Sequence, residues 1–144
     1  IWLNKGILGD DTHGHVDDIA RFVSKEIIFI ARENNKKDKN FSNLNENIKI
    51  LKKFVRENEK KIKIIYLPMP KAKYIEGIRV PASYLNFYIA NKIVLVPTFN
   101  DPNDKVVLKI FKKYFKTRKI VPINCSVLVW GFGTLHCMTQ QEPV

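Results

Sequence analysis

One candidate for covalent chemistry is a cysteine near the end of the sequence. Cys137 lies in the stretch GFGTLHCMTQQ, after two glycines and before a polar Thr-Gln-Gln run. Gly131 and Gly133 leave room for another strand or a ligand to approach the backbone closely. A free cysteine is more often a buried structural residue, and the stretch alone favours that interpretation. A nucleophilic thiol needs a base and an orienting group from elsewhere in the chain.

A suitable partner lies near the other end of the sequence, in GDDTHGHVDD. If His15-Val16-Asp17 is extended, the side chains of His15 and Asp17 point to the same side. An imidazole beside a carboxylate is the arrangement that general acid/base catalysis uses. For an isolated pair of this kind, a loop histidine held by its neighbour is the more common explanation. The pair therefore gains weight only together with the cysteine.

His136, although adjacent to the cysteine, is a weak candidate for its partner. If residues 131–141 are extended, side chains alternate between two faces. Cys137 then shares a face with Leu135 and Thr139, while His136 lies on the opposite face. The pattern predicts that the base for the thiol comes from another part of the chain.

Length and composition indicate one globular domain with one modest core. The chain has 144 residues, of which 45% are apolar, a normal share for a globular protein. It has no apolar run long enough to span a membrane and no secretory signal, so we expect a cytoplasmic protein without a membrane partner. The two cysteines, Cys125 and Cys137, favour free thiols in a reducing compartment. Because the chain opens on Ile1 and lacks an initiator Met, we expect it to begin inside a larger protein.

The formal charge of +11 raises nucleic acid as a partner, but its distribution argues against that class. Residues 32–73 carry thirteen Lys/Arg and five Asp/Glu, on a predicted helix and its flanks, where charge usually forms a solvated face. Residues 1–22 carry four Asp against two basic residues and hold two of the three histidines. A nucleic-acid module also needs aromatic side chains between its basic ones, whereas Phe41 and Phe54 fit a buried helix stripe better. A basic nucleic-acid-binding module stays a remote alternative.

The predicted elements repeat in order along the chain. Hairpin, helix and strand follow one another twice, at 19–31, 41–55, 63–67 and then at 85–96, 102–115, 119–124. The first helix follows from apolar residues spaced three and four apart, and the second from the start signal Asp-Pro-Asn-Asp. Two such units are a repeat of architecture and predict a piece of a larger repeat fold.

Several smaller expectations concern single segments. Residues 1–8 are predicted to end a strand, residues 71–77 to form a loop, and residues 63–67 to form a buried strand. The second helix is expected to bury its apolar side chains, which are Val106, Val107, Ile110, Phe111, Tyr114 and Phe115.

Five stretches together resemble a known family. They are GDDTHGHVDDIARF, LPMP, EGIRVPASYLNFYIAN, VPTFNDPND and HCMTQQEP, in that order. The set resembles the C-terminal part of agmatine deiminases, which belong to the bacterial peptidyl-arginine deiminase family within the pentein superfamily. The resemblance covers essentially all 144 residues. It implies an α/β fold, part of a five-bladed α/β propeller of ββαβ-like units around a central site. Residues 1–144 would be the C-terminal portion of that single domain, with the N-terminal units missing.

The resemblance also implies an activity and roles for individual residues. Agmatine and water would give N-carbamoylputrescine and ammonia, a step of putrescine and polyamine biosynthesis, without a metal or organic cofactor. The HCxTQQ motif makes Cys137 the nucleophile, and the HxD motif makes His15 the general acid/base. Asp17 would grip the guanidinium, and Asp11 falls at a second acidic position near the substrate. The local acidity of residues 1–22 suits such a cationic substrate.

Some alternatives stay open at this stage. Peptidyl-arginine or free arginine would be deiminated by the same chemistry, and a homo-oligomer is compatible with the sequence. Three positions depart from the family pattern: His13 stands for a common Asp, Phe132 for Gly and Thr134 for Asn. A metal hydrolase built on His13, His15, His136 and Cys137 is a rival with low weight, because the His13/His15 pair is weak evidence without a clear third and fourth ligand.

Overall fold

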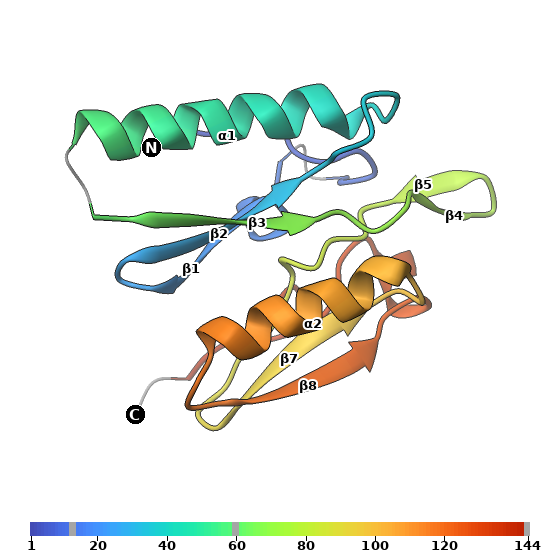
Figure 1. Cartoon of the computed structure of the whole chain (residues 1–144). Coiled ribbons are helices and arrows are strands. Elements are labelled where there is room, and N and C mark those ends of the chain that lie inside the picture. Colours follow the sequence, from blue (N-terminus) through green and yellow to red (C-terminus); the bar gives the residue numbers. More distant parts are fainter. Residues whose placement is uncertain (12–13, 59–60, 143–144) are drawn as a thin grey trace.

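The computed structural model describes residues 1–11, 14–58 and 61–142. One arrangement of elements occurs twice in it (Figure 1). The first unit consists of β1 (Ala20–Ser24), β2 (Ile27–Arg32), α1 (Asn40–Glu57) and β3 (Lys63–Pro68). The second consists of β6 (Tyr88–Ile89), β7 (Ile93–Thr98), α2 (Pro102–Tyr114) and β8 (Lys119–Asn124). The α/β class and the predicted hairpin, helix and strand repeat are confirmed.

The two sheets share one topology, which brings three loops to the same end. β1 pairs antiparallel with β2, and β2 pairs parallel with β3; β6, β7 and β8 pair in the same way. A parallel pair needs a crossover, and α1 and α2 supply it. The segments before β1 and before β6 and the segment after β8 therefore all lie at the carboxyl ends of the parallel strands. In α/β sheets this edge is where ligands usually bind.

One continuous core joins the units. Phe29 of β2 lies edge-on to Phe111 of α2 at a centroid distance of 5.3 Å, and Phe87 lies 4.9 Å from the same ring. The second helix thus packs against both sheets, as its position between β3 and β7 in Figure 1 shows. Because the core crosses the boundary between units, the segments that precede β1 and β6 are held in fixed relative positions.

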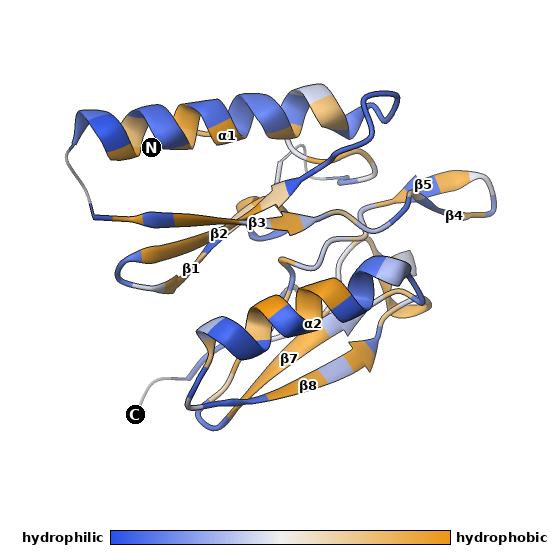
Figure 2. Ribbon diagram, viewed as in Figure 1, coloured by the Kyte–Doolittle hydropathy of each residue, from blue (hydrophilic) through white to orange (hydrophobic). Residues whose placement is uncertain are grey.

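The helices largely follow their sequence patterns. Leu44, Ile48 and Leu51 of α1 are buried, and Figure 2 shows this apolar side facing the sheet while the lysine-rich side faces out. The start of α2 is a capping box, in which Asp101 accepts from the Asn103 N–H and the Asp104 carboxylate accepts from the Asp101 N–H. No helix among the described residues is long and apolar enough to cross a membrane.

The expected burial of Val106 is wrong. Its side chain is 47% exposed, whereas Val107 and Phe111 are fully buried. These two residues are one turn apart and face the sheet together. Position 106 is rotated off that face by the helical period, so it meets solvent.

Three expectations for strands and loops are also corrected. Residues 1–8 form no strand: side chains of α1 hold them instead, as the N–H groups of Asn4 and Leu8 donate to Asn47 and Asn40. Residues 71–77 contain a strand, β4 (Lys73–Ile75), which pairs with β5 (Ile78–Val80) across a turn. Glu76 and Gly77 both have positive φ, 49° and 78°, as a type I′ hairpin turn requires. Strand β3 lies at a sheet edge and buries only Leu67.

Candidate active site

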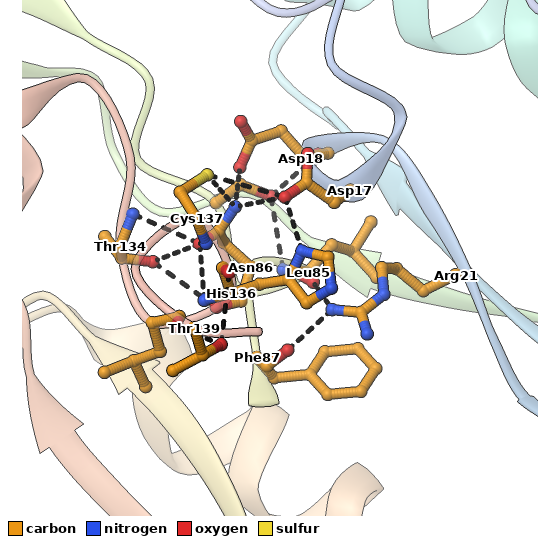
Figure 3. A network of polar contacts seen from close by, with 12 residues as sticks. Asp17, Asp18, Arg21, Leu85, Asn86, Phe87, Thr134, His136, Cys137 and Thr139 are labelled. Atoms are coloured by element: carbon orange, nitrogen blue, oxygen red, sulfur yellow. Dashed lines mark hydrogen bonds and ion pairs between the residues drawn. The ribbon is translucent and has the colours of Figure 1, made fainter. Parts of the chain in front are cut away.

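Three segments far apart in sequence meet at the carboxyl ends of the parallel strands (Figure 3). They are the short 3₁₀ turn η1 (Val16–Asp18) before β1, the segment 85–87 before β6, and residues 134–139 after β8. Another short 3₁₀ turn, η2 (Leu128–Gly131), leads from β8 into the last segment. Cys137 and Asp17 come from opposite ends of the chain, and the sulfur lies 3.5 Å from Asp17 Oδ2.

The segment that holds Cys137 is a turn, so the expected extended conformation of residues 131–141 is wrong. Residues 135–138 form the turn, and the Thr139 hydroxyl donates to the carbonyl of Leu135 at 2.9 Å. Gly133 is required by Cys137 itself, because a Cβ at position 133 would lie 2.8 Å from the sulfur. Phe132 has φ 60°, a left-handed conformation in which glycine is favoured. The departure from Gly at this position therefore carries a conformational cost.

His136 lies in the site, contrary to the expectation that it points away. Its Nδ1 is 2.7 Å from Asp17 Oδ2, the oxygen that Cys137 also contacts. In a turn, neighbouring side chains do not alternate as they do in a strand, and both residues reach the same carboxylate. Because a carboxylate accepts, the bond requires that Nδ1 of His136 carries the proton. His136 orients Asp17 and makes no direct side-chain contact with the thiol among the described residues.

The loop that precedes η1 holds the backbone of His15 beside the site. The carboxylate of Asp10 accepts from the N–H groups of Gly14 and His15, at 2.8 and 2.7 Å. His15 precedes a 3₁₀ turn, so the extended geometry expected for residues 15–17 is wrong. Even so, functional atoms of His15, Asp17 and Cys137 all lie within 4.8 Å of one another. The predicted three residues are therefore brought together by a turn instead of by strand alternation.

The same three residues are a set of donors that could hold a metal ion. An imidazole, a carboxylate and a thiolate are all ligands that zinc accepts. His136 uses Nδ1 on Asp17, and His13 lies outside the described residues. Asp11 is exposed in the loop that carries His15, and its role at the substrate stays a prediction.

The two thiols differ in accessibility. Both are free; Cys125 is buried in the core and Cys137 is exposed. Burial raises the pKa of Cys125 to about 11, which keeps this thiol protonated and inert. Partial burial also raises the pKa of Cys137; the hydrogen bond from Asn86 opposes this shift and the charge of Asp17 adds to it. A cation bound beside Asp17 would therefore favour the thiolate of Cys137.

Asp18 is a buried carboxyl group directly behind the site. Burial, reinforced by the charges of Asp17 and Asp10, raises its pKa from an ordinary 3.8 to about 8. Its Oδ1 accepts from Asn86, and its buried Oδ2 has no hydrogen-bond partner among the described residues. At neutral pH Asp18 is thus uncharged, and Asp17 carries the negative charge that faces the thiol.

The state of Asp18 predicts a pH dependence of stability. The native chain keeps a proton on Asp18 up to about pH 8, while the unfolded chain releases it near pH 4. The free energy of unfolding should therefore fall as pH rises through this range, by up to about 1.4 kcal/mol per pH unit. Asp18→Asn should remove this slope and unfold at higher urea concentration than the parent at pH 8. Urea titrations at several pH values measure both, and equal slopes for the two proteins would contradict the assignment.

Two polar residues of the site had no predicted role. Asn86 contacts Asp17, Asp18 and Cys137 through Nδ2, and Arg21 donates to the carbonyls of Leu85 and Phe87. The signal for Asn86 was a single amide within the otherwise apolar run YLNFYIA. The pattern shows that such a residue is unusual, but it does not show what the residue contacts.

An apolar cavity of about 330 Å³ adjoins the site. Asp17, Arg21 and His136 line it together with apolar side chains from the first unit and from the segment before it. Beside it, Val16 and Phe22 are 58% and 60% exposed. The described residues thus leave apolar surface open next to the candidate catalytic groups.

Fold and site together define a class of protein: ββαβ repeats whose loops bring a thiol, an imidazole and a carboxylate together at one edge. Residues 1–143 match the Porphyromonas-type peptidyl-arginine deiminase family, and the chain belongs to that family. A Legionella pneumophila protein provisionally named an agmatine deiminase is 35% identical over 144 residues, covering 99% of this chain and 41% of that protein.

Solved structures agree with this assignment. A Cys-to-Ser variant of the C. jejuni agmatine deiminase with substrate bound has a TM-score of 0.87 at 33% identity, covering 94% of this chain and 39% of that one. The agmatine deiminase of Enterococcus faecalis has a TM-score of 0.87 at 30% identity, covering 99% and 44%. The chain therefore spans about two fifths of the length of the relatives it matches.

Proposed function

We propose that this chain supplies the nucleophile and the acid/base group of an agmatine deiminase, which hydrolyses agmatine to N-carbamoylputrescine and ammonia. The observation that carries the proposal is the meeting of His15, Asp17 and Cys137 within 4.8 Å at one sheet edge. The names of the relatives support agmatine as the substrate over peptidyl or free arginine. On this proposal the enzyme acts in cytoplasmic putrescine and polyamine biosynthesis.

Asp17 is suited to orient a guanidinium group. Its Oδ2 is held by Asn86 at 3.0 Å and by His136 at 2.7 Å, while Oδ1 receives no hydrogen bond from the described residues. A carboxylate fixed on one side and open on the other can accept guanidinium N–H groups in a set plane. The bound cation also favours the Cys137 thiolate, so the nucleophile forms where its target is bound. Asp11 would supply a second negative charge at the substrate.

The reaction then follows from nucleophile and base. Cys137 Sγ attacks the guanidinium carbon and forms a tetrahedral adduct. His15 protonates the leaving nitrogen, ammonia departs, and a thiouronium group remains on the sulfur. Water, deprotonated by His15, attacks the same carbon, and the C–S bond breaks. N-carbamoylputrescine leaves with the added oxygen, and the thiol is restored without a metal or organic cofactor.

We further propose that residues 1–144 act as the C-terminal portion of a longer single-domain propeller. The relatives are more than twice as long as the chain, and two ββαβ units make only part of a closed ring. The open apolar surface at Val16 and Phe22 beside Asp17 would then be covered by the other units. Those units would also supply a further carboxylate to the substrate.

The structure offers little support for nucleic-acid binding by the basic region. Tyr66 is an aromatic residue of that region, and its ring lies beneath Arg32 and Lys52, at 5.3 and 5.6 Å. Its face is therefore occupied by the chain's own cations and is not open for a base to stack on. The lysines of α1 form an exposed face, as the helix pattern predicted.

One assay tests the proposed function. The full-length protein is given agmatine, free arginine or an arginyl peptide, each with and without prior dialysis against a strong chelator. We expect ammonia and N-carbamoylputrescine from agmatine at a rate that the chelator leaves unchanged. Activity lost on dialysis and restored by zinc would replace the thiol mechanism with the metal-hydrolase alternative. Faster hydrolysis of free arginine or the arginyl peptide than of agmatine would leave the thiol mechanism in place and replace agmatine as the proposed substrate.

A further inference from the structure

The side-chain amide of Asn86 contacts two carboxyl groups and the thiol of the site. Asn86 precedes β6 and is 1% exposed. Its Nδ2 lies 3.0 Å from Asp17 Oδ2, 3.2 Å from Asp18 Oδ1 and 3.0 Å from Cys137 Sγ. An amide nitrogen has two hydrogens, so three acceptors compete for two donors.

The amide oxygen of the same residue shapes the nucleophile loop. Oδ1 accepts from the N–H groups of Thr134, His136 and Cys137 at 3.1, 3.0 and 3.3 Å, and from the Thr134 hydroxyl at 3.0 Å. No strand ladder holds these residues, so a buried side chain satisfies their backbone. Figure 3 shows the loop folded around this amide.

Arg21 fixes the backbone on both sides of Asn86. Its Nη1 donates to the carbonyls of Leu85 and Phe87, at 3.3 and 2.6 Å. The guanidinium also stacks on the Phe87 ring, 4.4 Å from the centroid. With both neighbours held, the Asn86 side chain has a set direction, toward the sulfur.

We propose that Asn86 is a positioning residue, which aligns the loop of Cys137 and stabilises its thiolate through Nδ2. The inference rests on the proposed role of Cys137 as nucleophile. A thiolate is a better acceptor than a thiol, so the bond to Nδ2 strengthens when the sulfur ionises. When the sulfur is ionised, the uncharged Asp18 is the weakest of the three acceptors. The two Nδ2 hydrogens are therefore donated to Asp17 and to the sulfur.

The test is the pH dependence of Cys137 alkylation by iodoacetamide, followed on the Cys137 peptide of the full-length protein by mass spectrometry. Asn86→Asp keeps the shape of the side chain and an acceptor for the loop but removes the Nδ2 donor. We expect the midpoint of alkylation to rise by at least about one pH unit, which makes the rate at neutral pH about tenfold lower or more. At high pH, where the thiol is fully ionised, the rate should return to within a few-fold of the parent. The new carboxylate adds a charge beside the sulfur that by itself raises the midpoint, so a neutral variant, Asn86→Ser, separates the two roles. In that variant a purely structural role would lower the rate at every pH without moving the midpoint.

Two further variants keep the test decisive. Asn86→Ser adds no charge, so a raised midpoint in it reports the lost Nδ2 donor, and it should rise by less than in Asn86→Asp. It also covers the case in which Asn86→Asp does not fold, since the backbone carbonyl of residue 86 still accepts from the His136 N–H. Asn47→Asp is the matched control, since Asn47 is equally buried and bonds Asn4 and Lys5 away from the site. The control should lose stability and leave the midpoint unchanged.

The possible outcomes separate this inference from the proposed function. An alkylation midpoint in Asn86→Ser equal to that of the parent would overturn the role of Asn86. A shift of the same size in Asn47→Asp would overturn it as well. A shifted midpoint in a protein that does not hydrolyse agmatine would support Asn86 and reject the proposed function. Agmatine hydrolysis together with an unshifted alkylation midpoint would support the proposed function and reject the role of Asn86.

Discussion

Replacing Cys137 by Ala is expected to abolish ammonia release from agmatine, with a loss in kcat of about 10⁴-fold or more, as for other covalent nucleophiles. Cys137 is the exposed thiol, and its sulfur lies 3.5 Å from the carboxylate that would orient the substrate. Without the sulfur no covalent intermediate forms, and the remaining groups can only bind agmatine. Ammonia and N-carbamoylputrescine are both measured, in the full-length protein, because loss of both products excludes a change of product.

The second cysteine is the matched control for this prediction. Cys125 is buried at the end of β8 and lies outside the site network. Cys125→Ala should keep kcat within a few-fold and cost about 1 kcal/mol of unfolding free energy through a small core cavity. Full activity of Cys137→Ala beside an inactive but folded Cys125→Ala would reverse the assignment.

Asp17→Asn should lower kcat by about 100-fold or more, the size of effect typical of a well-placed acid/base or positioning group. The carboxylate accepts from both Asn86 and His136, and an amide in its place would turn a donor toward at least one of them. The substitution also removes the charge that orients the guanidinium. The loss is therefore expected in the transition state and not only in substrate affinity.

Steady-state kinetics distinguish these effects. A lowered kcat shows that Asp17 acts in the transition state, whereas an unchanged kcat with a raised KM would limit Asp17 to uniform binding. Asp38→Asn is a suitable control, since Asp38 is a half-buried carboxylate that binds Arg79 at 2.9 Å outside the site network. This control should lose stability and keep its kcat.

Local patterns were enough to predict the elements that support the site. The apolar spacing from Phe41 to Val55 and the start signal at Asp101 both depend on neighbours within one helix turn, and both helices formed as predicted. The hairpin predicted within residues 19–31 likewise formed, with a turn at residues 25–26 that joins β1 to β2. Such signals are legible because the interacting residues are close in sequence.

The contacts at the site depend on residues far apart, and the sequence did not show them. Asn86 lies 51 positions from Cys137 and 69 from Asp17. Its role exists only when the two ββαβ units pack against each other. The prediction that His136 points away from the site failed for a related reason. It assumed strand alternation for a segment that has no strand partner and folds as a turn. The neutral state of Asp18 follows from burial, which adjacent residues do not reveal.

Labelling by a haloacetamidine tests the central claim, that Cys137 attacks a guanidinium held by Asp17. The reagent carries an amidinium that mimics the substrate beside an alkylating carbon that captures a thiolate. The full-length protein is treated with and without agmatine, digested, and its two cysteine peptides are compared by mass. We expect a label on the Cys137 peptide, slowed by agmatine and by Asp17→Asn, with Cys125 unmodified. A label on Cys125 alone, or a label on Cys137 whose rate agmatine does not change, would contradict it.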